Sequence, residues 1–143
     1  YLIISDEMNR ALTLAAARGV DVRIVTPGIP DKRAAYAVTR SHYMRLARDG
    51  VKIYEYVPGF CHAKQCVADD EIATCGTINL DYRSLYHHFE NGVVMYNCRA
   101  VRDIKQDFET VFGKCLNVTD RYMEGKISIN IFRQVLRLFS VLM

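Results

Sequence analysis

The first 56 residues alternate between two hydrophobic periodicities, and this alternation limits the possible folds more than any other feature of the chain. Residues 5–18 and 31–48 carry apolar side chains three and four positions apart, which is typical of amphipathic helices. Residues 20–25 and 51–56 alternate apolar and polar side chains, which is typical of strands, and residues 1–4 form a further apolar run. This order of strands and helices requires crossover connections, so it predicts a largely parallel sheet covered by helices.

The pattern changes after Gly59. Residues 63–68 and 71–75 are predicted to be two strands of a hairpin, joined by a tight turn at Asp69-Asp70. Residues 89–96 supply another strand. Residues 99–114 repeat apolar side chains at helical spacing, which predicts a helix with one face on the core.

We therefore predict an α/β domain over residues 1–122, with a mixed, mostly parallel sheet flanked by helices, and a helical extension over residues 123–143. Within the extension, residues 127–143 form an amphipathic helix with a basic polar face. Three surfaces could receive its apolar face: another part of the protein, a membrane interface or the domain core.

Length and charge narrow the functional class. A chain of 143 residues is enough for one domain with its own core. The net charge of +3 is below the basic excess of a dedicated nucleic-acid binder, so no nucleic-acid partner is expected. No run approaches the roughly 20 apolar residues that cross a bilayer. Because the chain begins at Tyr1 without Met, we expect it to belong to a longer protein that could carry such a segment upstream.

The cysteines predict neither a metal site nor a full set of disulfides. There are five, an odd number, and none forms a C-x-x-C pair. Buried, reduced thiols are the simpler interpretation. The acidic run at residues 69–71 is interpreted as a hairpin turn, and the adjacent His87 and His88 are expected on opposite faces of a strand, so neither is expected to bind a metal.

Six positions form a dense chemical motif at the centre of the chain: His62, Lys64, Asp69, Gly76, Thr77 and Asn79. Residues two apart on a strand point to the same side, so His62 and Lys64 are expected to project together. Thr77 and Asn79 share this spacing on a returning segment. An ammonium, an amide and a hydroxyl suit phosphoryl oxygens, while an imidazole can attack phosphorus or protonate a leaving alcohol. The motif predicts a phosphodiester site.

The spacing H-x-K-x4-D-x6-G-[ST]-x-N resembles the signature of the phospholipase D superfamily, although Thr77 replaces the commoner Ser. Residues 20–23, 50–60, 79–84 and 89–91 are similar to the C-terminal half of bacterial cardiolipin synthases. The resemblance covers nearly the whole chain. It implies an α-β-α sandwich and transfer of a phosphatidyl group between two phosphatidylglycerol molecules through a phosphohistidine, with no cofactor and no metal.

The resemblance also implies catalytic roles. His62 would form the phosphohistidine or act as the acid and base facing it. Lys64 and Asn79 would bind the phosphoryl oxygens, with support from Thr77. Glu90 would lie behind His62, accept its Nδ1 hydrogen and stabilise the imidazolium.

Four further positions have supporting roles in this interpretation. Gly76 would let the backbone approach the substrate closely. Tyr82 and Arg83 could line the substrate pocket, although packing explains Tyr82 equally well. Asp69, on the hairpin turn, is expected to point away from the site and to have a structural role in the turn or in an ion pair.

One motif supplies only one histidine, whereas in-line displacement at phosphorus places nucleophile and leaving group on opposite sides. The second histidine must come from the N-terminal half of the same protein or from a second copy. By analogy with two-motif relatives, His62 would be the general acid. Whether His62 acts instead as the nucleophile stays open. The parent protein is expected at the bacterial cell membrane, with this domain as a soluble part apposed to the membrane surface. Alternatives are a homodimeric phospholipase D-family endonuclease and a non-catalytic interaction module.

Overall fold

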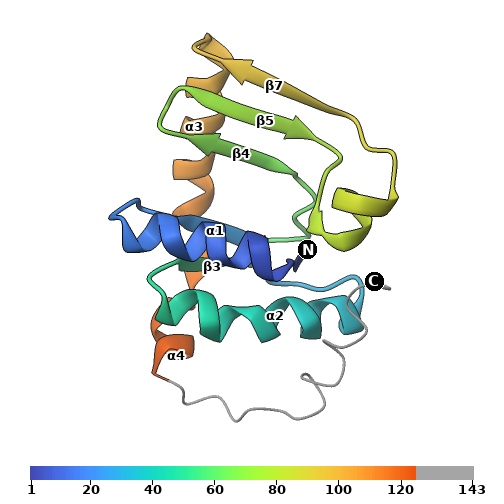
Figure 1. Ribbon diagram of the computed structural model, residues 1–143, viewed down its shortest axis with the longest axis vertical. Helices are drawn as coiled ribbons and strands as arrows, with labels where there is room; N and C mark the ends of the chain where they lie inside the picture. Colours follow the sequence, from blue (N-terminus) through green and yellow to red (C-terminus); the bar gives the residue numbers. More distant parts are fainter. Residues whose placement is uncertain (125–143) are drawn as a thin grey trace.

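A computed structural model describes residues 1–124 of the chain (Figure 1). Its helices are α1 (Asp6–Ala17), α2 (Arg33–Arg48), α3 (Arg99–Phe112) and α4 (Thr119–Met123), with a π-helical turn η1 (Arg83–His87). Its strands are β1 (Leu2–Ile3), β2 (Arg23–Pro27), β3 (Lys52–Tyr56), β4 (Gln65–Ala68), β5 (Ile72–Gly76), β6 (Leu80–Asp81), β7 (Gly92–Tyr96) and β8 (Cys115–Asn117). The amphipathic helix predicted over 127–143 lies outside the described residues.

The strands of residues 1–124 form small sheets with mixed pairing. β1 pairs with β6, and β2 pairs with β3, both parallel. β8 adds to β3 in the antiparallel sense, and β4, β5 and β7 form an antiparallel sheet. The mixed α/β class is confirmed. The two parallel pairs, β1–β6 and β2–β3, join strands that a longer connection separates. The β4–β5 hairpin and the return to β7 need no crossover connection, so these strands pair in the antiparallel sense.

The helices lie on both sides of these sheets. α2 contacts β1, β3 and α4, whereas α3 packs on β3, β4, β5 and β7. In Figure 1, α3 runs behind the β4–β5–β7 sheet and α2 lies at the opposite end of the molecule with α4. The predicted flanking of the sheet by helices is therefore present.

Local signals explain where the first helix begins and ends. The Ser5 side chain accepts a hydrogen bond from Met8 N at 3.2 Å, so it caps α1 as the sequence predicts. At the other end, Gly19 has a φ of 91° and Val20 N bonds back to Ala15 O at 3.1 Å. Because this closing turn uses Val20, the strand predicted at residues 20–25 begins only at Arg23.

A core between α2, the first strands and α4 stabilises the half of the domain away from the motif. Its buried residues are Leu2, Ile4, Tyr43, Leu46, Ala47, Val51, Ile53, Val118 and Tyr122. The Tyr43 hydroxyl reaches Thr26 Oγ1 at 2.5 Å, and burial raises the pKa of Tyr43. Arg40 Nε bonds to the Tyr122 hydroxyl at 2.7 Å and pairs with the buried Glu55 at 3.2 Å. These contacts match Tyr43, Thr26, Arg40, Glu55 and Tyr122 to one another, whereas the side-chain polar atoms of the buried Asn9 have no hydrogen-bond partner within residues 1–124.

Replacing Tyr43 with Phe is expected to lower the free energy of unfolding by about 1–3 kcal/mol, because Thr26 loses its buried hydroxyl partner while the ring stays in place. Urea denaturation followed by circular dichroism measures this. The control is Tyr96→Phe, at a tyrosine that is 64% exposed, which should leave stability unchanged. Equal stability of the two variants would contradict a stabilising Thr26–Tyr43 bond.

Candidate active site

The end of the motif at Gly76 and Thr77 meets the segment that carries Glu90 because β5 and β7 approach very closely. Gly76, at the end of β5, pairs with Gly92, at the start of β7. A Cβ atom on Gly76 would collide with Asn91 O and lie 2.6 Å from Gly92 Cα, an approach that no side chain tolerates. The sequence predicts that Gly76 gives a substrate room to approach, but the close packing of β7 already requires a glycine at this position.

Thr77 joins this contact to Glu90. Its backbone N–H donates to Asn91 O at 2.9 Å, and its hydroxyl accepts from Asn91 N at 3.0 Å. The same hydroxyl donates to the Glu90 carboxylate. Hydrogen bonds from Thr77 and then Ser84 lower the pKa of Glu90, with smaller electrostatic contributions from His88 and Lys64. Glu90 is therefore an anion at neutral pH.

His62 and Lys64 lie in the connection that leads into β4, rather than on the strand that the sequence predicts from residue 63. The His62 ring is exposed and lies 5.8 Å from the Phe60 ring. Lys64 Nζ donates to the His62 carbonyl at 2.7 Å. Lys64 O in turn accepts from Gly76 N at 3.1 Å, which fixes this connection to the end of β5.

The implied pairing of Glu90 with the His62 ring is not formed. Within residues 1–124, no hydrogen bond or ion pair joins these two side chains. The carboxylate of Glu90 is taken up by Thr77 and Ser84 instead. No motif in the sequence pointed to Ser84, which lies in the turn η1 and is brought to Glu90 by that turn.

The segment before Glu90 also differs from the prediction. Residues 83–87 form η1 and β7 begins only at Gly92, so His87 and His88 are not on a strand. Arg83 donates to His88 Nε2 from Nε at 3.3 Å and from Nη2 at 3.1 Å. Nε2 is then the acceptor of a neutral ring, so the hydrogen lies on Nδ1, which faces Glu90 Oε1 at 3.9 Å.

Tyr82 and Asn79, two further residues that the sequence predicts at the site, lie close to β6 in the chain. Tyr82 is half-buried and its ring lies 5.7 Å from that of Tyr86, so it has a packing contact. Asn79 lies directly before β6 and is half-buried. Burial lowers the pKa of the Tyr1 amino group, while the charge of Asp81, the residue that ends β6, raises it and that of Lys64 lowers it.

Asp69 lies in the hairpin turn, as predicted. Asp69 and Asp70 have left-handed φ angles of 53° and 60° and form the centre of a tight turn that Glu71 N closes by donating to Ala68 O at 3.1 Å. The neighbouring Asp70, rather than Asp69, forms an ion pair, with Lys105 of α3. Among residues 1–124, no cluster of three or more His, Cys, Asp or Glu side chains is arranged to hold a metal ion.

The fold and this motif define a phospholipase D-like domain. The family described as "Cardiolipin synthase, PLD-like domain" matches residues 1–112, and the chain belongs to this family.

Relatives cover the chain along its whole length. It is 36% identical over 144 residues to cardiolipin synthase 2 of Bacillus anthracis, covering 100% of this chain and 28% of that protein. A Streptococcus mutans protein is 48% identical over 144 residues, covering 100% of the chain and 31% of that protein. The chain thus spans less than a third of the length of these relatives.

Solved structures share the fold. The crystal structure of Nuc from Salmonella typhimurium, a phospholipase D family member, superposes with a TM-score of 0.70 at 21% identity. The superposition covers 82% of this chain and 76% of Nuc.

Replacing Gly76 with Ala is expected to destabilise the domain by roughly 1–3 kcal/mol, because the new methyl group would collide with the backbone of Asn91 and Gly92. Thermal unfolding measures the loss. Gly59→Ala is the matched control, since nothing lies within 4 Å of its Cβ position. A Gly76 variant as stable as the Gly59 variant would refute the close approach of β5 and β7.

Replacing Thr77 with Val is expected to raise the pKa of Glu90 towards its ordinary value, because the main hydrogen bond to the carboxylate is removed at nearly constant shape. Thr77→Ser keeps the hydroxyl and should keep the lowered pKa. Carbon-13 NMR titration of the Glu90 side chain measures both. Since folding lowers this pKa, its contribution to stability is complete above the ordinary glutamate pKa and is lost as the pH falls through the folded value. An unchanged titration in Thr77→Val would contradict the assignment.

Proposed function

We propose that this chain is one catalytic half of a phosphatidyltransferase that makes cardiolipin from two phosphatidylglycerol molecules. The observation that supports the proposal is that Lys64, Thr77 and Glu90 are all attached to the end of β5 at Gly76. Lys64 is tied to Gly76, and Thr77 is tied to Glu90. The synthase activity named for the Bacillus anthracis relative agrees with a lipid phosphodiester as substrate.

In this proposal His62 transfers the phosphoryl group or the proton. Its ring is exposed and, within residues 1–124, makes no hydrogen bond or ion pair, so it is accessible to a substrate. Lys64 complements a phosphoryl anion, since its Nζ lies at the His62 backbone, and we propose that Asn79, directly before β6, adds an amide donor. Arg83 adds an exposed cation that could bind a second phosphate.

The reaction would run in two steps. One histidine attacks phosphorus and forms a phosphohistidine, while a second histidine protonates the departing glycerol. The hydroxyl of a second phosphatidylglycerol then displaces the first histidine and gives its proton to the second. His62 is assigned the general-acid role. Glu90 accepts hydrogen bonds from Thr77 and Ser84 and none from His62, so we propose that substrate or the second half brings Glu90 and His62 together.

The second histidine would come from a part of the protein outside this chain or from a second copy. One face of the β4–β5–β7 sheet supports a large partner. α3 covers the face that contains the buried Ala73, whereas the opposite face exposes Ile72, Val94 and Tyr96. An exposed apolar face of this kind fits a protein surface that packs on it. The proposed location is the bacterial cell membrane surface. Within residues 1–124, no helix is long and apolar enough to span a bilayer.

The test uses the full-length protein on phosphatidylglycerol vesicles, with cardiolipin measured by mass spectrometry. His62→Ala and Lys64→Ala should each lower the rate by roughly 10²–10⁴-fold, the usual range for loss of a proton-transfer or charge-stabilising group. Lys114→Ala, at an exposed lysine after α3, is the matched control and should retain activity.

DNA offered in parallel separates the alternatives. Cleavage of DNA without lipid turnover would replace the proposal with a nuclease. Absence of both activities in a folded wild-type protein would favour a non-catalytic module. Full cardiolipin synthesis by the His62 variant would remove His62 from the mechanism.

A further inference from the structure

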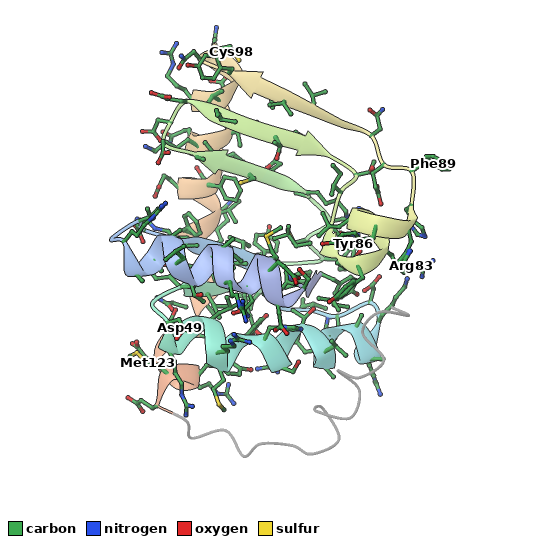
Figure 2. The ribbon with its side chains drawn as sticks, viewed as in Figure 1. Asp49, Arg83, Tyr86, Phe89, Cys98 and Met123 are labelled. Atoms are coloured by element: carbon green, nitrogen blue, oxygen red, sulfur yellow. The ribbon has the colours of Figure 1, made fainter. Side chains whose placement is uncertain are left out.

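Two large aromatic side chains are exposed directly beside the candidate site. Tyr86 of η1 is 62% exposed, and Phe89, the residue before Glu90, is 108% exposed. We call these two residues the aromatic rim. Figure 2 shows the rim with Arg83 on η1 and its connection to β7, at the end of the sheet where the motif lies.

The backbone that carries the aromatic rim is fixed at both ends. His88 N donates to Arg83 O at 2.8 Å, which closes η1, and Thr77 N holds Asn91 at 2.9 Å just beyond Phe89. The Tyr86 ring also rests on the Tyr82 ring at 5.7 Å. The two aromatic side chains therefore project from an ordered segment and bury little of their surface within residues 1–124.

Arg83 is an exposed cation beside the aromatic rim, three residues before Tyr86. His87 and His88 lie between the aromatic residues, and His88 accepts hydrogen bonds from Arg83. The nearest carboxylate in the sequence, Glu90, is held by its hydrogen-bond donors and is largely shielded, with a side chain 15% exposed. Aromatic side chains next to cations are the composition of a protein surface that lies at the headgroup level of an anionic bilayer.

We propose that the aromatic rim inserts into the interfacial layer of an anionic phospholipid bilayer and holds the motif at the level of the lipid phosphates. The proposal rests on the proposed function, because a lipid phosphodiester lies in the headgroup layer and the residues next to its binding site must meet the same layer. A protein partner fits the uncovered face of the β4–β5–β7 sheet better. The strand positions on that face, among them Ile72, Val94 and Tyr96, carry no charged side chain.

The kinetic test compares two forms of phosphatidylglycerol with the full-length protein: vesicles, and a short-chain form dispersed as monomers. The variant Tyr86→Ala/Phe89→Ala should show a rate at least about tenfold lower at subsaturating vesicle concentration. The reason is that it lacks the two aromatic side chains that the bilayer would bury, so it binds the membrane more weakly. Its rate on monomeric lipid should stay within about twofold. The matched control is Leu14→Ala/Val20→Ala, at positions 59% and 46% exposed on and after α1, which should change neither rate.

Equal losses on vesicles and on monomers would overturn the proposal, because the aromatic rim would then serve the fold, the reaction or a protein contact. An unchanged rate on vesicles would overturn it as well.

A second measurement needs no catalysis and so separates this proposal from the proposed function. The 143-residue chain contains no tryptophan. Phe89→Trp, introduced into the full-length protein, should add fluorescence that phosphatidylglycerol with brominated acyl chains quenches, whereas Leu14→Trp should add fluorescence that iodide in water quenches. If the fluorescence added by Phe89→Trp is shielded from both quenchers, protein covers the rim, and if only iodide quenches it, the rim stays in water. Either result overturns the proposal.

Discussion

The contact between Gly76 and the backbone of Asn91 and Gly92 is the constraint on which the site depends. It is tighter than any side chain permits, so the end of β5 and the start of β7 are locked in one register. Lys64 is attached to the β5 side through its carbonyl, and Glu90 is attached to the β7 side by Thr77. Backbone packing, rather than direct contact between the chemical groups, therefore brings distant parts of the sequence together.

Within residues 1–124, the carboxylate of Glu90 and the imidazole of His62 are not paired with each other. Glu90 is held as an anion by neutral donors, Thr77 and Ser84, and not by His62. The imidazole of His62 lies beside the Phe60 ring and makes no hydrogen bond within the described residues. Within residues 1–124, the unpaired His62 ring and the exposed face of the β4–β5–β7 sheet are the two features that support the proposal of a second half.

The other end of the domain serves as a rigid support. Its core contains an internally matched polar set, in which Arg40 binds both Glu55 and the Tyr122 hydroxyl, and Tyr43 binds Thr26. These groups lie between α2, α4 and the first strands, away from the motif. A stable core on one side leaves the opposite end of the β4–β5–β7 sheet free to carry exposed and charged side chains.

Periodicity and motif spacing in the sequence determined the α/β class, the order of the elements from β1 to β5, the helix α3, the helix cap at Ser5 and the hairpin turn at Asp69. Each of these depends on neighbours in the chain, where side-chain period and turn chemistry act directly. Tertiary structure alone decided that Glu90 binds Thr77 and Ser84 rather than His62. It also decided that residues 83–87 form η1 and expose Tyr86 and Phe89. These outcomes depend on which strands lie side by side and at what distance, and no spacing along the chain encodes that distance.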